Sequence, residues 1–246
     1  MKILLLDIET SPNTAYVWGL FNENIPLARL IDSSEVLCWS AKWYGDTEIM
    51  FSSVLQSSRK KLLKGIHSLL SDADAVVTYN GNRFDLPVLN KEFFMEGMSP
   101  PAPYKRIDLY QTVKQQFRFT SNKLDHVADQ LGFGKKKDTT FQLWVDCMNQ
   151  DEAAWKSMEE YNRHDVVLLE QLYTKVLPWI SNHPNHGMFV DGRPVCPACG
   201  SNHIQKRGIA FAKALQYIRF QCQTCGSWFK STNAINSNKK PQLNKI

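Results

Sequence analysis

Residues 2–10 read KILLLDIET, and this stretch decides the fold. The apolar run Ile3–Leu6 is too short to span a membrane and lacks helical spacing, so it predicts a central strand buried on both faces. Asp7 and Glu9 follow at the end of that strand. Because side chains two apart on a strand point to one face, we expect these two carboxylates side by side. A Mg²⁺ site would use such oxygens, although a strand ending in a solvated acidic turn would look the same.

The composition is that of an ordinary globular protein. The chain has 246 residues, of which 43% are hydrophobic and 22% charged, enough for one sizeable core and a small appendage. No apolar run is long enough for a transmembrane helix, and Asp7 interrupts the first run too early for a signal peptide. We therefore expect a cytoplasmic protein with no membrane partner. In that reducing setting, six cysteines favour metal ligands or free thiols over disulfides.

Charge is distributed unevenly along the chain. Residues 190–246 hold nine Lys or Arg against a single acid, Asp191, which gives this end a net charge of +8. The first 189 residues hold 20 basic and 23 acidic residues, hence −3. A basic end on a slightly acidic body indicates a polyanionic partner, and nucleic acid is the leading candidate.

The pattern of apolar residues predicts an α/β fold. Antiparallel strands come first and parallel strands follow, separated by amphipathic helices, so the sheet should be mixed and flanked by helices. We expect strands over residues 2–10, 15–20, 36–43, 47–53, 75–79 and 105–107. Helices are expected over residues 58–70, 86–95, 109–117, 124–131 and 151–176.

A second candidate site segment, YNGNRFDLPVL, covers residues 79–89 and follows the predicted strand 75–79. It lies at the carboxyl end of a parallel strand, where open α/β sheets place their ligands, so Asp85 is a candidate third metal carboxylate. With Pro87 in the first helical turn, Asp85 could instead be a helix cap. Asp108 opens the next helix and is explained by capping alone.

The helix predicted over residues 151–176 carries an acid on its apolar stripe. The stripe runs from Trp155 and Met158 to Leu169 and beyond at steps of three and four residues, and filling its gap places Tyr161 and Asp165 on the buried face. A buried carboxylate without a partner is unfavourable. We therefore expect Asp165 to share a metal with the acids that end the first strand.

Together these segments resemble the DEDD superfamily of 3′–5′ exonucleases, in its DEDDy branch. The motifs that carry the resemblance are Asp7-x-Glu9, Asn80-x-x-x-Phe84–Asp85 and Tyr161-x-x-x-Asp165. The resemblance covers roughly residues 1–178. This part of the chain is similar to the proofreading exonuclease domain of family B DNA polymerases, which has an RNase H-like fold.

The resemblance implies a two-metal site. Asp7, Glu9, Asp85 and Asp165 would hold two Mg²⁺ or Mn²⁺ ions. Tyr161 would orient the attacking water, because a tyrosine is a poor general base at neutral pH. Asn80, Arg83 and Phe84 would contact the nucleic acid, although Phe84 could be only a core residue.

Paired cysteines mark a separate C-terminal unit. After a linker over residues 179–194, Cys196-Pro-Ala-Cys199 and Cys222-Gln-Thr-Cys225 stand 22 residues apart. Four thiolates in two C-x-x-C pairs bind Zn²⁺ tetrahedrally, so residues 195–231 are expected to form a zinc ribbon around one structural Zn²⁺. Residues 232–246 are expected to be a disordered tail.

The ribbon has two possible roles. Its basic side chains alternate with Phe211, Tyr217 and Phe220, which suits single-strand binding by charge and stacking, but the rings could instead be the core of so small a domain. The basic residues concerned are Lys206, Arg207, Lys213 and Arg219. Alternatively, the ribbon could dock onto a replication or repair protein.

The sequence therefore predicts a metal-dependent 3′–5′ exonuclease that acts on single-stranded or frayed DNA, with single-stranded DNA favoured over RNA. An RNA exonuclease or a structure-selective nuclease on the same fold is the enzymatic alternative. A non-catalytic nucleic-acid-binding protein is the alternative from another class.

Overall fold

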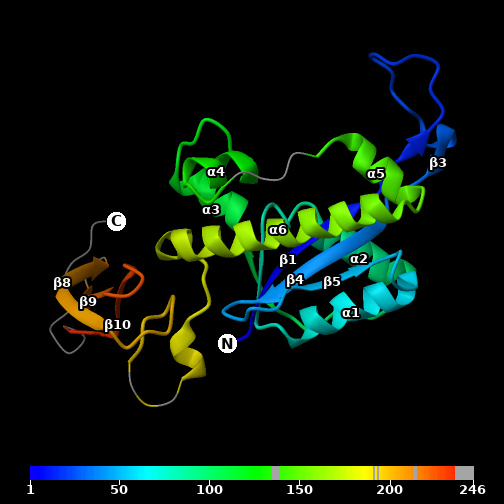
Figure 1. Cartoon of the computed structure of the whole chain (residues 1–246). Helices are drawn as coiled ribbons and strands as arrows, with labels where there is room; N and C mark the ends of the chain where they lie inside the picture. Colours follow the sequence, from blue (N-terminus) through cyan, green and yellow to red (C-terminus); the bar gives the residue numbers. More distant parts are fainter. Residues whose placement is uncertain (135–138, 191, 193, 213–214, 236–246) are drawn as a thin grey trace. The chain divides into compact units, whose positions relative to one another are not determined.

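The computed structural model describes residues 1–134, 139–190, 192, 194–212 and 215–235 (Figure 1). The chain divides into two compact units, one over residues 2–173 and the other from Thr174 onward.

The first unit is built on a mixed five-stranded sheet whose central strand is β1 (Ile3–Thr10). On one side β1 pairs antiparallel with β4 (Val36–Trp43), which pairs antiparallel with β5 (Met50–Ser53). On the other side β1 pairs parallel with β6 (Ala75–Thr78), and β6 pairs parallel with β7 (Lys105–Asp108). The sequence-based expectation of antiparallel strands followed by parallel strands is confirmed.

Helices cover both faces of this sheet (Figure 1). They are α1 (Arg59–Asp72), α2 (Asp85–Met95), α3 (Leu109–Gln116), α4 (Leu124–Gln130), α5 (Phe141–Met148) and α6 (Glu152–Val176). Helices α1 and α2 pack against one face, where they meet alternate residues of β1 such as Leu4 and Leu6. Helices α5 and α6 pack with β4 in a second apolar cluster. None of the helices in the described segments is long and apolar enough to cross a membrane.

The strand expected over residues 15–20 is wrong. The structure has only a two-residue strand there, β2 (Thr14–Ala15), paired with β3 (Leu30–Asp32), and a short 3₁₀ turn η1 (Leu27–Arg29) precedes β3. Residues 16–20 leave the sheet and are largely exposed. The apolar and aromatic run AYVWGL at residues 15–20 records side-chain type, not whether a neighbouring strand covers it, and here none of the described strands does. We call residues 14–32 the finger.

Helix α5 was not expected from the sequence. Only Cys147 in it is fully buried, and Phe141 at its start is exposed, so its apolar stripe is short. Its N-cap, Thr140, makes no side-chain capping hydrogen bond. The helix therefore lacks the capping signal that usually marks a helix start in a sequence.

The second unit contains a three-stranded antiparallel sheet in the order β10-β9-β8. Its elements are η2 (Leu177–Trp179), η3 (His186–Phe189), β8 (Ile204–Ala212), β9 (Leu215–Cys222) and β10 (Trp228–Ala234). Part of the expected linker contacts the first cysteine pair, since the His186 N–H donates to the Pro197 carbonyl at 2.8 Å. Strand β10 continues to Ala234, beyond the expected start of the tail at residue 232, and residues 236–246 lie outside the described part of the chain.

Candidate metal-binding active site

Three carboxylates converge where β1 ends beneath α6. Asp7 and Glu9 stand on one face of β1, and Asp165 reaches them from α6. Oxygen atoms of the three groups all lie within 4.8 Å of one another, and Asp165 is only 2% exposed. The register of β1 and the stripe of α6 thus bring together residues more than 150 positions apart.

Like charge makes this arrangement unfavourable while all three carboxylates are ionised. At no more than 4.8 Å, two ionised carboxylates repel by roughly 3 kcal/mol at an effective dielectric constant of about 20. Three such pairs lie in the cluster. Protons or a divalent cation would relieve the repulsion, and carboxylate oxygens are the ligands that Mg²⁺ prefers. The donor set therefore fits Mg²⁺ or Mn²⁺.

Asp85 lies beside this cluster and is not its fourth member in the structure. It is buried at the start of α2, and its Oδ1 accepts the N–H of Ile8, the residue between Asp7 and Glu9, at 3.2 Å. The N-cap of α2 is Phe84, so the capping alternative does not describe Asp85. Burial raises the pKa of Asp85 to about 7, although its own N–H and that of Ile8 oppose the shift.

Asp108 does more than cap a helix. Its Oδ1 accepts the N–H of Tyr110 at 3.1 Å, as expected of the N-cap of α3. The same carboxylate also accepts the N–H of Asn80 at 2.8 Å and that of Asn82 at 3.3 Å. Asn80 has a φ of 65°, a conformation that most residues avoid. Asp108 therefore fixes the loop that precedes Asp85.

The remaining residues of that loop are at the surface. Arg83 is exposed and Phe84 is 42% exposed, so Phe84 is not a core residue. Gly81 is required where it stands, because a Cβ at this position would overlap the Thr78 side chain. The structure thus presents Asn80, Arg83 and Phe84 on a tightly specified turn next to Asp85.

Asn162 is a site residue that the sequence reasoning missed. It is fully buried, and its Nδ2 donates to Asp7 Oδ2 at 2.6 Å. Its buried Oδ1 meets no donor among the described residues, and a water on a bound cation would supply one. The signal was present, since strict alternation of three- and four-residue steps from Met158 passes through position 162 and reaches Asp165.

Trp144 of α5 is the second residue that was missed. Its Nε1 donates to Glu9 Oε2 at 3.2 Å, and its ring meets that of Tyr161 edge-on, with centroids 5.8 Å apart. Tyr161 itself is 7% exposed. Because α5 was not predicted, the sequence reasoning did not single out Trp144. Asn162 and Trp144 each hold one of the two β1 carboxylates in place.

Comparison with known proteins places this geometry in a family. Residues 4–177 match the family described as the RNase_H superfamily, which is more than half of the chain. The chain belongs to the RNase H superfamily. Its mixed sheet flanked by helices agrees with that membership.

A solved structure of the family B DNA polymerase from the hyperthermophilic archaeon Pyrobaculum calidifontis is similar to this RNase H superfamily chain. The TM-score is 0.55 at 21% identity, over 72% of this chain and 24% of the polymerase chain. This likeness shows the fold alone, and the matched part spans about a quarter of the polymerase. No match was found among curated proteins. Family and fold support a nuclease, whose substrate is nucleic acid.

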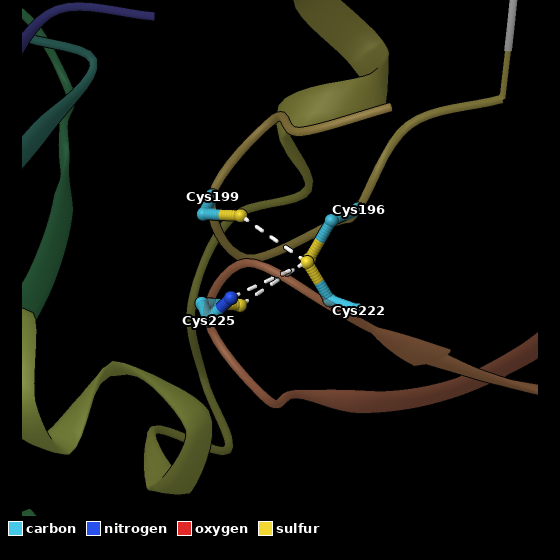
Figure 2. Close-up of side chains that lie close together, drawn as sticks. All are labelled: Cys196, Cys199, Cys222 and Cys225. Atoms are coloured by element: carbon cyan, nitrogen blue, oxygen red, sulfur yellow. Dashed lines mark hydrogen bonds between the residues drawn. The ribbon is translucent and has the colours of Figure 1, made fainter. Parts of the chain in front are cut away.

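The four cysteines of the second unit also converge (Figure 2). Sulfur atoms of Cys196 and Cys225 are 3.7 Å apart, and those of Cys199 and Cys222 are 3.6 Å apart. Burial raises the pKa of Cys196 to about 11. Burial also acts on Cys222, but the N–H groups of Cys225 and Thr224 outweigh it and lower its pKa to about 7. Four convergent sulfurs, one of them readily ionised, fit a metal that binds thiolates, such as Zn²⁺.

The rings of the ribbon divide between core and surface. Phe220 stacks on Phe229, with centroids 5.8 Å apart, whereas Phe211 is 72% exposed. Of the four basic residues that the sequence indicated, Lys206, Arg207 and Arg219 are exposed, and Lys213 lies outside the described residues. The guanidinium of Arg219 also lies 5.2 Å from the centroid of the Trp228 ring.

The raised pKa of Asp85 predicts a pH-dependent stability. Folded Asp85 keeps its proton up to about pH 7, whereas an unfolded aspartate loses it near about pH 4. Between these values the unfolded chain binds fewer protons, so Asp85 makes the free energy of unfolding fall as pH rises. In EDTA, Asp85→Asn should show a smaller fall than wild type in urea titrations across this range. Asp46→Asn, in an exposed turn, should follow wild type; a profile of Asp85→Asn parallel to wild type would contradict the assignment.

The contact of Asn162 with Asp7 predicts an effect on metal affinity. Asn162→Ala should weaken Mn²⁺ binding by about 10-fold or more, because partners that orient metal ligands typically contribute 10- to 100-fold. Calorimetric titration of Mn²⁺ without nucleic acid measures this directly. Asn90→Ala, at an exposed position of α2, is the control and should bind as wild type. Equal affinities in all three proteins would show that Asn162 is only a packing residue.

Proposed function

We propose that the chain is a metal-dependent 3′–5′ exonuclease that hydrolyses single-stranded or frayed DNA. The observation that carries the proposal is the convergence of Asp7, Glu9 and Asp165, with Tyr161 one turn before Asp165 on α6. These residues occupy the motif positions that resemble the DEDDy exonucleases. Membership of the RNase H superfamily supports nuclease chemistry on this sheet.

The proposed site holds two Mg²⁺ or Mn²⁺ ions on Asp7, Glu9 and Asp165, with Asp85 completing the set. When bound, the ions would polarise a water and stabilise the leaving oxygen. The pKa of Asp85, about 7 without a cation, leaves the group partly protonated at neutral pH, and it would ionise fully as a cation arrives, so that the fourth carboxylate adds less repulsion beforehand.

The chain's own residues position the reactants. Tyr161, its ring fixed against Trp144, would hold the attacking water by a hydrogen bond. Water oxygen joins phosphorus as the bond from phosphorus to the 3′-oxygen breaks, which releases a 5′-nucleotide and leaves a new 3′-hydroxyl. Asn80, Arg83 and Phe84 would hold the terminal nucleotide, since the turn that carries them adjoins Asp85.

The ribbon is proposed to bind one structural Zn²⁺ through Cys196, Cys199, Cys222 and Cys225 and to aid binding of nucleic acid. Exposed Lys206, Arg207 and Arg219 support a contact with phosphates. The second role, docking onto a replication or repair protein, remains compatible with the same surface.

The choice of DNA over RNA follows the resemblance of the three motifs to the proofreading exonuclease domain of family B DNA polymerases, and the RNA exonuclease or structure-selective nuclease is the second candidate. A non-catalytic binding protein is disfavoured. Such a protein would not need three repelling carboxylates held in contact, and here two of them receive dedicated donors from Asn162 and Trp144.

Digestion of 5′-labelled oligonucleotides tests the proposal. With Mg²⁺ or Mn²⁺, the full chain should shorten single-stranded DNA from its 3′ end and be inactive in EDTA. Asp165→Asn should lose activity by at least about 100-fold, more than the loss of an outer partner of a metal ligand. The matched control is Glu152→Gln, an exposed carboxylate on the same helix, which should digest as wild type.

A parallel RNA oligonucleotide separates the substrate alternatives. Faster digestion of RNA would move the assignment to an RNA exonuclease. Binding without products from either polymer would contradict the catalytic proposal and leave a binding protein.

A further inference from the structure

The finger exposes large apolar side chains that the fold does not use. Trp18 is 91% exposed, Phe21 87% and Tyr16 76%, and Leu20 and Leu27 are equally open. Single exposed apolar residues are common, but several large ones gathered on one projecting segment usually mark a binding surface. The finger is therefore a candidate binding surface.

The finger is a braced structure and not a loose loop. The N–H of Tyr16 donates to the Arg29 carbonyl at 3.1 Å, which extends the short β2–β3 pairing. Across the turn, Arg29 forms an ion pair with Glu23 at 2.6 Å, and Glu23 also accepts the N–H of Gly19 at 3.1 Å. The aromatic rings are thus carried outward on a defined frame, which lowers the entropy lost when something binds them.

The finger has few charged residues and a net charge of −1. Glu23 and Arg29 pair with each other, and Asp32 stands at its base in β3. A surface of this kind has no cation to offer a phosphate. Flat rings without charge suit the faces of unpaired bases, on which aromatic side chains stack irrespective of sequence.

The finger begins at the catalytic end of the sheet. Only Thr10–Asn13 separate Glu9 from β2, and the Ser11 N–H donates to the Glu35 carbonyl at 2.8 Å to tie the two ends of the insertion together. Figure 1 shows the finger projecting beyond the sheet near α5, the helix whose Trp144 contacts Glu9. A strand with its 3′ end at the carboxylates can continue toward these rings.

We propose that Tyr16, Trp18 and Phe21 form a stacking platform for unpaired bases upstream of the nucleotide held at the carboxylate cluster. The inference rests on the proposed function, and it assigns to the finger the selection of single-stranded over paired nucleic acid. Paired bases have their faces covered by their neighbours and cannot stack on the rings. An apolar groove of another protein and a second copy of this chain are the competing occupants.

Binding of a labelled single-stranded oligonucleotide of about 15 nucleotides, a length within reach of such surfaces, tests the platform. The full chain carrying Trp18→Ala and Phe21→Ala is compared with wild type by fluorescence anisotropy in EDTA, where hydrolysis cannot contribute. Each lost ring should weaken binding at least about 5-fold, as expected for base stacking. The slope of affinity against salt should not change, because no ionic contact is removed.

Matched variants separate stacking from other effects. Phe94→Ala removes an equally exposed ring from α2 and should bind as wild type. Trp18→Phe keeps a ring and should restore most of the affinity. In Mg²⁺, the double variant should raise KM for the long strand while leaving turnover of a dinucleotide unchanged, which a merely structural defect would not do.

Two results would overturn the platform. One is a double variant that binds and digests the oligonucleotide as wild type does. The other is a change from dimer to monomer in sedimentation with no loss of oligonucleotide affinity, which assigns the finger to a second copy. Failure of the proposed function is distinguishable: ring-dependent binding by a wild-type chain that hydrolyses nothing would refute the exonuclease and keep the platform.

Discussion

Repulsion among three carboxylates is the constraint on which the first unit depends. Asp7 and Glu9 cannot move apart, because the strand that carries them is the buried centre of the sheet, paired on both sides. Asp165 cannot move away from them, because the apolar stripe of α6, the helix that carries it, packs against the sheet. The packing of the fold thus holds together groups that would otherwise separate, and a divalent cation bound between them would relieve their repulsion.

The surroundings of the cluster reduce the repulsion only in part. Donors from Asn162, Trp144 and the Ile8 N–H each reach one carboxylate of the site. They fix orientation more than they neutralise charge, which is what a metal site needs from its outer partners. The second unit offers different ligands, since four sulfurs suit a soft metal where carboxylates suit a hard one.

Local patterns predicted the parts of the site that depend on periodicity. Alternation on β1 placed Asp7 beside Glu9, and an acid on an apolar stripe marked Asp165. Asn162 was missed because the stripe was filled through Tyr161, although both residues are buried. Trp144 was missed because α5, the helix that carries it, was not predicted. Residues 15–20 of the finger were mistaken for a strand, since a short apolar and aromatic run fits a covered strand and a projecting segment equally well. Whether another part of the fold buries such a segment decides between a strand and a projecting loop, and the local sequence does not contain that information.

The central claim is that the carboxylate cluster is a divalent metal site, and anomalous diffraction from crystals soaked in Mn²⁺ tests it most directly. The account predicts anomalous density at coordination distance from the carboxylates of Asp7, Glu9 and Asp165, and none there in crystals of Asp165→Asn. Saturating Mn²⁺ that leaves no density between these three residues would contradict it, because the repulsion would then be relieved by protons alone.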